Sequence, residues 1–233
     1  MLLAISLRPR SLPQHAPFDR WYYCTDHYQK LFDALGVPLL PYYSRAQLAA
    51  VAGLCDGLVL TGNVHDIPPH YYGAAPLAGR TYEDDDFALD DWAIRLFASQ
   101  DKPILGICKG MQLIGLYFGA GFCQHLPTAQ KHRYLKYDQI HPSQTVPGSF
   151  LDLLYGACPT INSAHHQGLR FPAGTGGTAE NSSTKIAVIQ RCDDGVIEGI
   201  VHKTLPIFGL QWHPERLCGR FFRPGAIDGS LVF

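Results

Sequence analysis

The segment from Lys102 to Leu116 constrains the fold of this chain more than any other stretch. It begins with a short apolar run after a proline, Ile104-Leu105, which is typical of a buried parallel strand. The next five residues, Gly106-Ile107-Cys108-Lys109-Gly110, have the G-x-nucleophile-x-G form of a nucleophile elbow, with cysteine in place of serine. Two flanking glycines would let the backbone fold tightly around a strained central residue. The segment therefore predicts a strand, a sharp turn at Cys108 and then a helix.

Apolar residues recur at helical spacing after this turn, at Met111, Leu113, Ile114, Leu116 and Tyr117. Cys108 is therefore expected at the N-terminus of a helix that is buried on one face, where the helix dipole favours thiolate over thiol. A buried structural cysteine in a glycine-flanked turn fits the same five residues. The motif alone does not separate these two interpretations.

Composition narrows the class of protein. A chain of 233 residues, 46% hydrophobic and 17% charged, predicts one folded domain over residues 1–233. With a net charge of -1 and no basic run, neither nucleic acid nor a membrane is expected as a partner. No signal peptide or membrane-spanning stretch is recognised, which favours the cytoplasm. The seven cysteines include no CxxC pair, which favours free thiols over disulfides or a structural zinc site.

Strand and helix patterns alternate along the chain. Strands are expected at residues 1–7, 37–40 (halted by Pro41) and 57–60, and helices at 28–35, 45–51 and 82–99. Residues 8–17 read as a Pro-rich surface loop, and the acidic run at 83–86 as a solvated helix start. Three short strands follow at 186–190, 196–201 and 206–210, the first two joined by a hairpin turn. This order predicts an α/β fold, a doubly wound, mostly parallel central sheet with helices on both faces.

Two polar segments are candidates for binding loops. Thr61–Gly73 follows the third strand, and loops at the carboxyl ends of strands form the crevice of a doubly wound sheet. Such a loop could bring a backbone N–H beside the elbow and complete an oxyanion hole, although an ordinary Gly/Pro loop fits the same residues. Thr160–Gly168 is also polar enough to favour a binding loop over a core element.

Three histidines, His125, His132 and His141, have irregular spacing. A zinc site is one interpretation of them, but it is disfavoured because they lack cysteine partners and an H-E-x-x-H pattern, so no metal is predicted.

The last predicted strand runs into Gln211-Trp212-His213-Pro214-Glu215. A catalytic cysteine needs a nearby imidazole to hold its proton and a third group to orient that imidazole. His213 and Glu215 have this chemistry, and Pro214 between them gives a rigid extended turn from which both can project. This pattern favours a Cys-His-Glu site over a structural cysteine.

The two motifs, Gly106–Gln112 and Gln211–Glu215, resemble the signature motifs of the class I glutamine amidotransferase superfamily, whose fold is flavodoxin-like. Residues 62–73 and 162–167 resemble more closely its gamma-glutamyl-GABA hydrolase-like branch, within the gamma-glutamyl hydrolase family. The resemblance covers nearly the whole chain. It implies that Cys108 is the nucleophile, His213 the base and Glu215 the residue that orients the base.

The resemblance also implies the remaining site residues. Backbone N–H groups of Lys109 and of Gly62 or Asn63 would form the oxyanion hole. The substrate-binding candidates are Gln112, Ser163, His165 and His166.

Three positions depart from the family pattern. Lys109 stands where arginine is usual, which leaves the backbone N–H donor intact. Asn63 replaces a common glycine, so the donor in that loop stays open between Gly62 and Asn63. His125 stands where aspartate is usual, without a functional explanation from the sequence.

The function implied is a cysteine hydrolase that cleaves a γ-glutamyl amide, such as γ-glutamyl-GABA, through a thioester on Cys108, with no metal or organic cofactor. The alternative is the glutaminase subunit of an amidotransferase, which would deliver ammonia to a synthase partner. A redox-sensing module is a third interpretation, disfavoured because a sensor needs no orienting carboxylate such as Glu215. The amine half of the substrate and the oligomeric state, a homodimer included, stay open.

Overall fold

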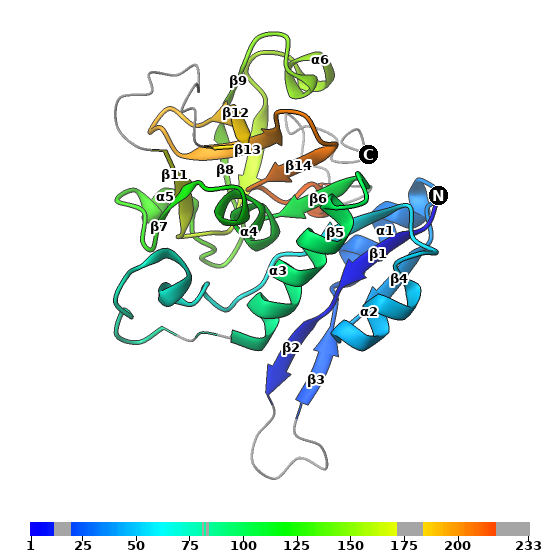
Figure 1. Ribbon diagram of the computed structural model, residues 1–233. Coiled ribbons are helices and arrows are strands. Elements are labelled where there is room, and N and C mark those ends of the chain that lie inside the picture. The colour runs from blue at the N-terminus through cyan, green and yellow to red at the C-terminus, as the bar shows by residue number, and fades with distance from the viewer. Residues whose placement is uncertain (12–19, 81, 83, 172–183, 218–233) are drawn as a thin grey trace.

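The computed structural model describes residues 1–11, 20–80, 82, 84–171 and 184–217 (Figure 1). Its centre is an eight-stranded sheet in the order β4-β1-β5-β6-β14-β13-β12-β9. The first five strands in this order are parallel, and the last three continue the sheet in antiparallel fashion. The strands of this sheet are β1 (Leu3–Ser6), β4 (Leu39–Tyr42), β5 (Gly57–Leu60), β6 (Ile104–Ile107), β9 (Gln144–Thr145), β12 (Ile186–Arg191), β13 (Ile197–His202) and β14 (Ile207–Leu210).

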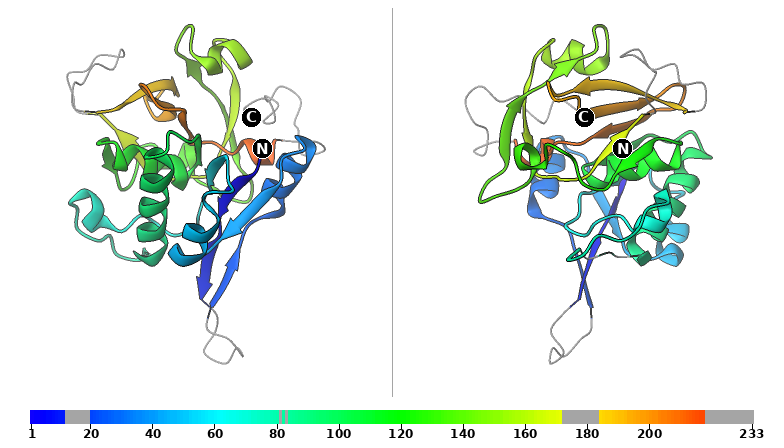
Figure 2. Two further views of the ribbon diagram at one scale, coloured as in Figure 1. Left: turned by 45° about the vertical axis from the view of Figure 1, so that its right-hand side comes forward. Right: turned by 90° about the vertical axis from the view of Figure 1, so that its left-hand side faces the viewer.

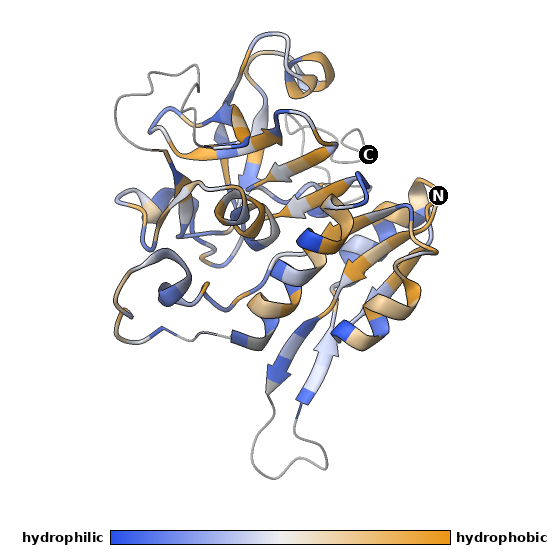
Figure 3. Cartoon of the chain, in the orientation of Figure 1, coloured by the Kyte–Doolittle hydropathy of each residue, from blue (hydrophilic) through white to orange (hydrophobic). Residues whose placement is uncertain are grey.

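Helices cover both faces of the sheet (Figure 2). Successive strand residues point to opposite faces: Leu58 and Leu60 join the core of α3 and α4, whereas Val59 joins the core of α1. In Figure 3 the apolar colour is concentrated in the central strands and in the helices packed against them. The predicted doubly wound α/β fold is therefore confirmed. The helices are α1 (Asp26–Ala34), α2 (Arg45–Val51), α3 (Asp84–Ala98), α4 (Lys109–Tyr117), α5 (Ala129–His132) and α6 (Phe150–Tyr155), with 3-10 turns η1 (Pro69–Tyr72) and η2 (Pro214–Arg216).

Local signals predicted most of these elements closely. Helix α2 and strand β5 have the bounds expected from the sequence, and β12 and β13 form the expected hairpin. The halt at Pro41 is wrong, because β4 continues to Tyr42. Strand β4 lies at the edge of the sheet and pairs only with β1, a position where a strand tolerates proline.

The expected surface loop at residues 8–17 is also wrong over its first part. Strand β2 (Arg8–Ser11) pairs antiparallel with β3 (Arg20–Tyr23), and Arg8 is buried. A two-stranded ribbon tolerates Pro9 because each strand has one partner only. Residues 12–17 lie outside the described residues.

Two further ribbons stand beside the main sheet. Strand β7 (Gly121–Cys123) pairs with β11 (Gly168–Arg170), and β8 (Gln139–Pro142) pairs with β10 (Thr160–Ser163). The polar segment expected as a binding loop at 160–168 therefore begins as a strand and becomes a loop only after Ser163. Within the described residues, no helix has both the length and the apolar character needed to cross a membrane.

Candidate active site

The elbow has the strained geometry that its glycines predict. Cys108, between β6 and α4, has φ 53° and ψ -107°, a conformation that non-glycine residues rarely adopt. A Cβ on Gly106 would lie 2.5 Å from the Gly110 carbonyl, and a Cβ on Gly110 would lie 2.2 Å from the Leu60 carbonyl oxygen. Both positions therefore require glycine for α4 to pack closely on β5 and β6.

His213 and Cys108 meet at Gly62. A Cβ on Gly62 would lie 3.3 Å from His213 Cε1 and 3.4 Å from Cys108 Cβ. His213 Nδ1 lies 2.7 Å from Glu215 Oε1, and both side chains are buried. His213 Nε2, the other ring nitrogen, forms no hydrogen bond with a described residue. One ring nitrogen is thus held by the carboxylate, while the other is available for proton exchange.

The electrostatics of this group favour an imidazolium at neutral pH. Burial and the Arg216 guanidinium oppose protonation of His213, but Glu215 and Cys108 outweigh them and raise its pKa to about 9. Burial likewise opposes ionisation of Glu215, yet His213 holds the pKa of that carboxyl below its usual value.

The His213 backbone is fixed by a residue that the sequence analysis did not single out for this role. Asn162 on β10 donates from Nδ2 to the His213 carbonyl at 3.1 Å and accepts from the His213 N–H at 3.0 Å. Arg216 Nη1 donates to Asp138 Oδ1 at 2.7 Å, and Asn162 Nδ2 also donates to Asp138 at 3.0 Å. These contacts tie the His-Pro-Glu turn to the β8–β10 ribbon.

The backbone N–H groups at the two predicted oxyanion positions differ in whether they already have a hydrogen-bond acceptor. Lys109 is the first residue of α4, so its N–H has no acceptor within the helix. The Gly62 N–H donates to the Tyr28 hydroxyl at 3.0 Å, and Asn63 Nδ2 donates to Asp86 at 2.7 Å. Tyr28 lines the site, whereas its helical spacing alone indicated only a core position.

A cavity of about 700 Å³ opens over Cys108 and His213. Of the substrate-binding candidates, it is lined by Gln112, His165 and His166. The structure does not place Ser163 with them: its side chain is fully buried and donates to the His132 carbonyl at 3.0 Å. Ser163 is the last residue of β10, and its side chain is engaged with α5 rather than facing the cavity.

The rim of the cavity carries a charged cluster that the sequence did not indicate. His166 Nε2 lies 2.8 Å from Asp66 Oδ1 and 3.3 Å from Arg80 Nη1. His125, the family departure, lies 3.3 Å from His166 and 3.4 Å from Arg80. Burial and the neighbouring His166 lower the pKa of His125. Arg133 also lines the cavity.

Comparison with known proteins identifies the same superfamily as the two motifs. The sequence matches the Peptidase C26 family over residues 8–215. The chain belongs to this family. It therefore falls within the class I glutamine amidotransferase-like superfamily, which indicates a hydrolase or amidotransferase enzyme.

Individual relatives agree with this assignment. YvdE of Lactococcus lactis, named as glutamine amidotransferase-like, is 30% identical over 228 residues, covering 92% of this chain and 90% of the relative. A glutamine amidotransferase structure from Thermotoga maritima has a TM-score of 0.58 at 14% identity and covers 92% of this chain and 75% of its own. The glutaminase domain of CTPS from Trypanosoma brucei, with bound acivicin, has a TM-score of 0.59 at 13% identity, covering 99% and 91%. Both structures share the fold.

Beneath the elbow of this C26 family member lies a buried ion network. Arg8 Nη1 donates to Asp86 Oδ1 at 2.7 Å and also pairs with Asp90, while Lys109 Nζ lies 2.8 Å from Asp86 Oδ2. The solvated helix start expected at 83–86 is therefore wrong for Asp86, which is 4% exposed. Glu83 lies outside the described residues.

The charges of this network depend on one another. Burial alone would raise the pKa of Asp86, but Arg8 and Lys109 hold it well below its usual range. Burial raises the pKa of Asp90 to about 6, against the pull of Arg8 and with a contribution from Asp86. Asp86 is thus the anion that both buried cations share.

We expect Asp86→Ala to lower the free energy of unfolding by roughly 3–5 kcal/mol, because it leaves Lys109 and part of Arg8 buried without a partner. The matched control is Asp91→Ala on the same helix, whose partially exposed pair with Arg95 should contribute ~0.5 kcal/mol. Urea unfolding followed by circular dichroism measures both. Equal losses of unfolding free energy in the two variants would contradict a stabilising role for the buried ion network.

Proposed function

We propose that this C26 family member hydrolyses γ-glutamyl amides, with Cys108 as the nucleophile, His213 as acid and base, and Glu215 as the orienting carboxylate. One observation carries the proposal. Cys108 stands in a strained turn at a helix N-terminus, beside a histidine whose far nitrogen is bonded to a buried carboxylate, and all three line one cavity. A reactive thiol needs this combination of thiolate-favouring dipole and proton acceptor.

The proposed reaction has two halves. The Cys108 thiolate attacks the γ-carbonyl carbon, and the carbonyl oxygen becomes an oxyanion. This oxyanion accepts hydrogen bonds from the Lys109 N–H and from the N–H of Asn63, or from that of Gly62 once it releases the Tyr28 hydroxyl. The His213 imidazolium then gives its proton to the departing amine, which leaves a γ-glutamyl thioester. Water loses a proton to His213 and attacks the thioester, which releases glutamate and restores the thiolate. Each oxyanion donor contributes about 3 kcal/mol of transition-state stabilisation.

The rim of the cavity favours an amine half that carries a carboxylate, as GABA does. Arg80 and Arg133 both line the cavity and offer guanidinium groups that bind carboxylates through charge-assisted hydrogen bonds. Arg80 is held beside His166 and Asp66, so its position is restricted before substrate arrives. This supports the gamma-glutamyl-GABA hydrolase-like branch over a neutral leaving amine.

The alternative is a glutaminase subunit that delivers ammonia to a synthase partner. It is favoured by the relative YvdE, whose name is glutamine amidotransferase-like. A free-standing hydrolase turns over alone, whereas such a subunit is slow until its partner is added.

The first test ranks the three residues by rate. Cys108→Ala should lower kcat by roughly three orders of magnitude or more, because no covalent route remains, and His213→Asn nearly as much. Glu215→Gln should cost roughly ten-fold less than either, since it disturbs orientation while both reacting groups stay. Steady-state glutamate release from γ-glutamyl-GABA, with no other protein added, measures this order.

Cys55→Ala serves as the control for this series, because Cys55 is a buried cysteine outside the cavity lining. A Cys108→Ala protein as active as wild type would exclude both enzyme interpretations at this site. Activity that appears only after a synthase is supplied would favour the amidotransferase subunit.

The second test concerns pH. Because the His213 pKa is about 9, kcat/KM should fall as pH rises through that value, where the imidazolium loses the proton that the leaving amine needs. Glu215→Gln removes a negative charge that raises this pKa, so the alkaline limb should move to lower pH. If initial-rate profiles of Glu215→Gln show the alkaline limb at the same pH as in wild type, the limb does not report the titration of His213.

The third test concerns the amine half of the substrate. Arg80→Ala should raise KM for γ-glutamyl-GABA roughly ten-fold or more, because a charge-assisted hydrogen bond is lost. The same variant should leave KM for γ-glutamyl methylamide, which lacks that carboxylate, close to wild type. Arg95→Ala, outside the cavity lining, is the matched control. Equal effects on both substrates would instead assign Arg80 to the glutamyl half.

A further inference from the structure

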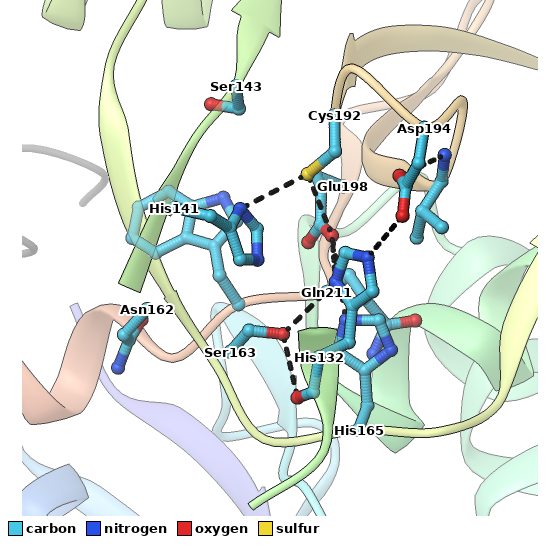
Figure 4. A network of polar contacts seen from close by, with 12 residues as sticks. His132, His141, Ser143, Asn162, Ser163, His165, Cys192, Asp194, Glu198 and Gln211 are labelled. Carbon is cyan, nitrogen blue, oxygen red and sulfur yellow. Dashed lines mark hydrogen bonds and ion pairs between the residues drawn. The ribbon is translucent and has the colours of Figure 1, made fainter. Parts of the chain in front are cut away.

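A second cluster of reactive side chains lies outside the cavity lining. His132 at the end of α5, His141 on β8, Cys192 just after β12 and Glu198 on β13 converge on one point (Figure 4). One donor atom of each residue lies within 4.8 Å of the donor atoms of the other three. None of these four residues lines the cavity over Cys108.

Three of the six distances between donor atoms lie in the range of a tetrahedral zinc site, and the other three are no longer than 4.8 Å. Cys192 Sγ lies 3.3 Å from His141 Nδ1 and 3.3 Å from Glu198 Oε1, and His132 Nδ1 lies 3.5 Å from Glu198 Oε1. Zinc bonds of about 2.0–2.3 Å in tetrahedral geometry place ligand atoms about 3.3–3.8 Å apart. To share one ion, the side chains must bring the remaining three pairs of donor atoms into the same range.

Several buried polar atoms in this cluster have no hydrogen-bond partner among the described residues. They include Glu198 Oε2 and His141 Nε2, which belong to side chains whose other polar atoms, Oε1 and Nδ1, face Cys192 Sγ. Unsatisfied buried polar groups of this kind cost free energy unless an ion or a water satisfies them. His165 Nε2 also lies 3.5 Å from Glu198 Oε1.

The surroundings of His132 have the form of a metal-bound histidine. Its Nε2 lies 2.9 Å from Asp194 Oδ2, which leaves Nδ1 to face Glu198. A carboxylate that accepts the far N–H fixes the ring and its tautomer in zinc sites. Ser163, which lies 3.4 Å from that Nδ1, keeps its hydrogen bond to the His132 carbonyl when the nitrogen binds metal.

We propose that His132, His141, Cys192 and Glu198 bind one Zn²⁺ ion as a closed structural site. One sulfur, two imidazole nitrogens and a carboxylate oxygen are ligands that zinc accepts, and four protein ligands leave no open position for catalysis. Binding releases the Cys192 thiol proton to solvent and forms a zinc–thiolate bond. The resulting complex of Zn²⁺, thiolate, carboxylate and two neutral imidazoles has no net charge.

This ion would strengthen one wall of the candidate active site. It joins α5, β8 and the β12–β13 hairpin, segments that the sequence separates widely. The His132 carbonyl accepts from the His165 N–H at 2.9 Å, and His165 lines the cavity. Metal removal is therefore expected to lower the melting temperature by several degrees and to loosen that wall.

The test measures metal directly, on full-length protein made without a polyhistidine tag. After incubation with Zn²⁺ and removal of excess, plasma mass spectrometry should find about one zinc per chain. Cys192→Ser and His141→Asn should reduce this to a small fraction. Cys55→Ser should retain it, and so should Cys108→Ala, which tests whether the catalytic cysteine is the ligand instead.

A second measurement needs no substitution and guards against variants that fail to fold. Co²⁺ bound to the wild-type protein should give the visible absorption of a tetrahedral site and a thiolate-to-cobalt charge-transfer band. Wild-type protein that takes up no stoichiometric zinc, or zinc that depends on Cys108 rather than Cys192, would overturn the proposal.

Discussion

The buried pair of Arg8 with Asp86 holds together the parts from which the candidate active site is built. Arg8 begins β2, and besides Asp86 on α3 it donates to the carbonyls of Thr61 and Gly62 in the loop after β5. Asp86 in turn binds Lys109 at the start of α4. The two backbone segments expected to hold the oxyanion are thus tied to one carboxylate. An uncompensated charge here would be costly, because all three ionic side chains are almost fully buried.

The elbow adds a second constraint, which is local strain at Cys108. A non-glycine residue in this conformation costs of order 1–3 kcal/mol, and the surrounding packing must offset it. Helix α4 supplies that packing, since its residues from Lys109 to Gly115 are all buried. Gly110 allows the helix to approach the Leu60 carbonyl, so the strained cysteine is clamped between two parallel strands and a buried helix. A thiol held in this way cannot relax away from His213 without moving α4.

The sequence predicts the structure correctly where the residues that determine a segment's conformation lie within that segment. The elbow and the bounds of α2 follow from glycine and apolar spacing within a few residues. The extended turn expected at His213-Pro214-Glu215 is wrong in its backbone, because Pro214–Arg216 form a 3-10 turn. Prediction fails where the partner is remote in sequence. The acidic run around Asp86 predicts a solvated carboxylate, because its partner Arg8 lies 78 residues away in the sequence. The contact between Cys192 and His141 is likewise not predicted, because 51 residues separate them in the sequence.

Two groups of cysteine, histidine and glutamate lie within the described part of the chain, and their surroundings differ. Cys108 lines a cavity at a helix N-terminus, and its histidine has one ring nitrogen bonded to a carboxylate and the other with no hydrogen bond to a described residue. Such a pair can exchange protons with a substrate. Cys192 instead follows a β-hairpin strand, beneath the surface, and faces two histidines and a carboxylate. Burial and the neighbouring Glu198 raise the pKa of its thiol, so it stays protonated unless a cation replaces the proton. Access to the cavity and the number of converging donors, rather than residue type, therefore separate the proposed nucleophile from the proposed metal ligand in this chain.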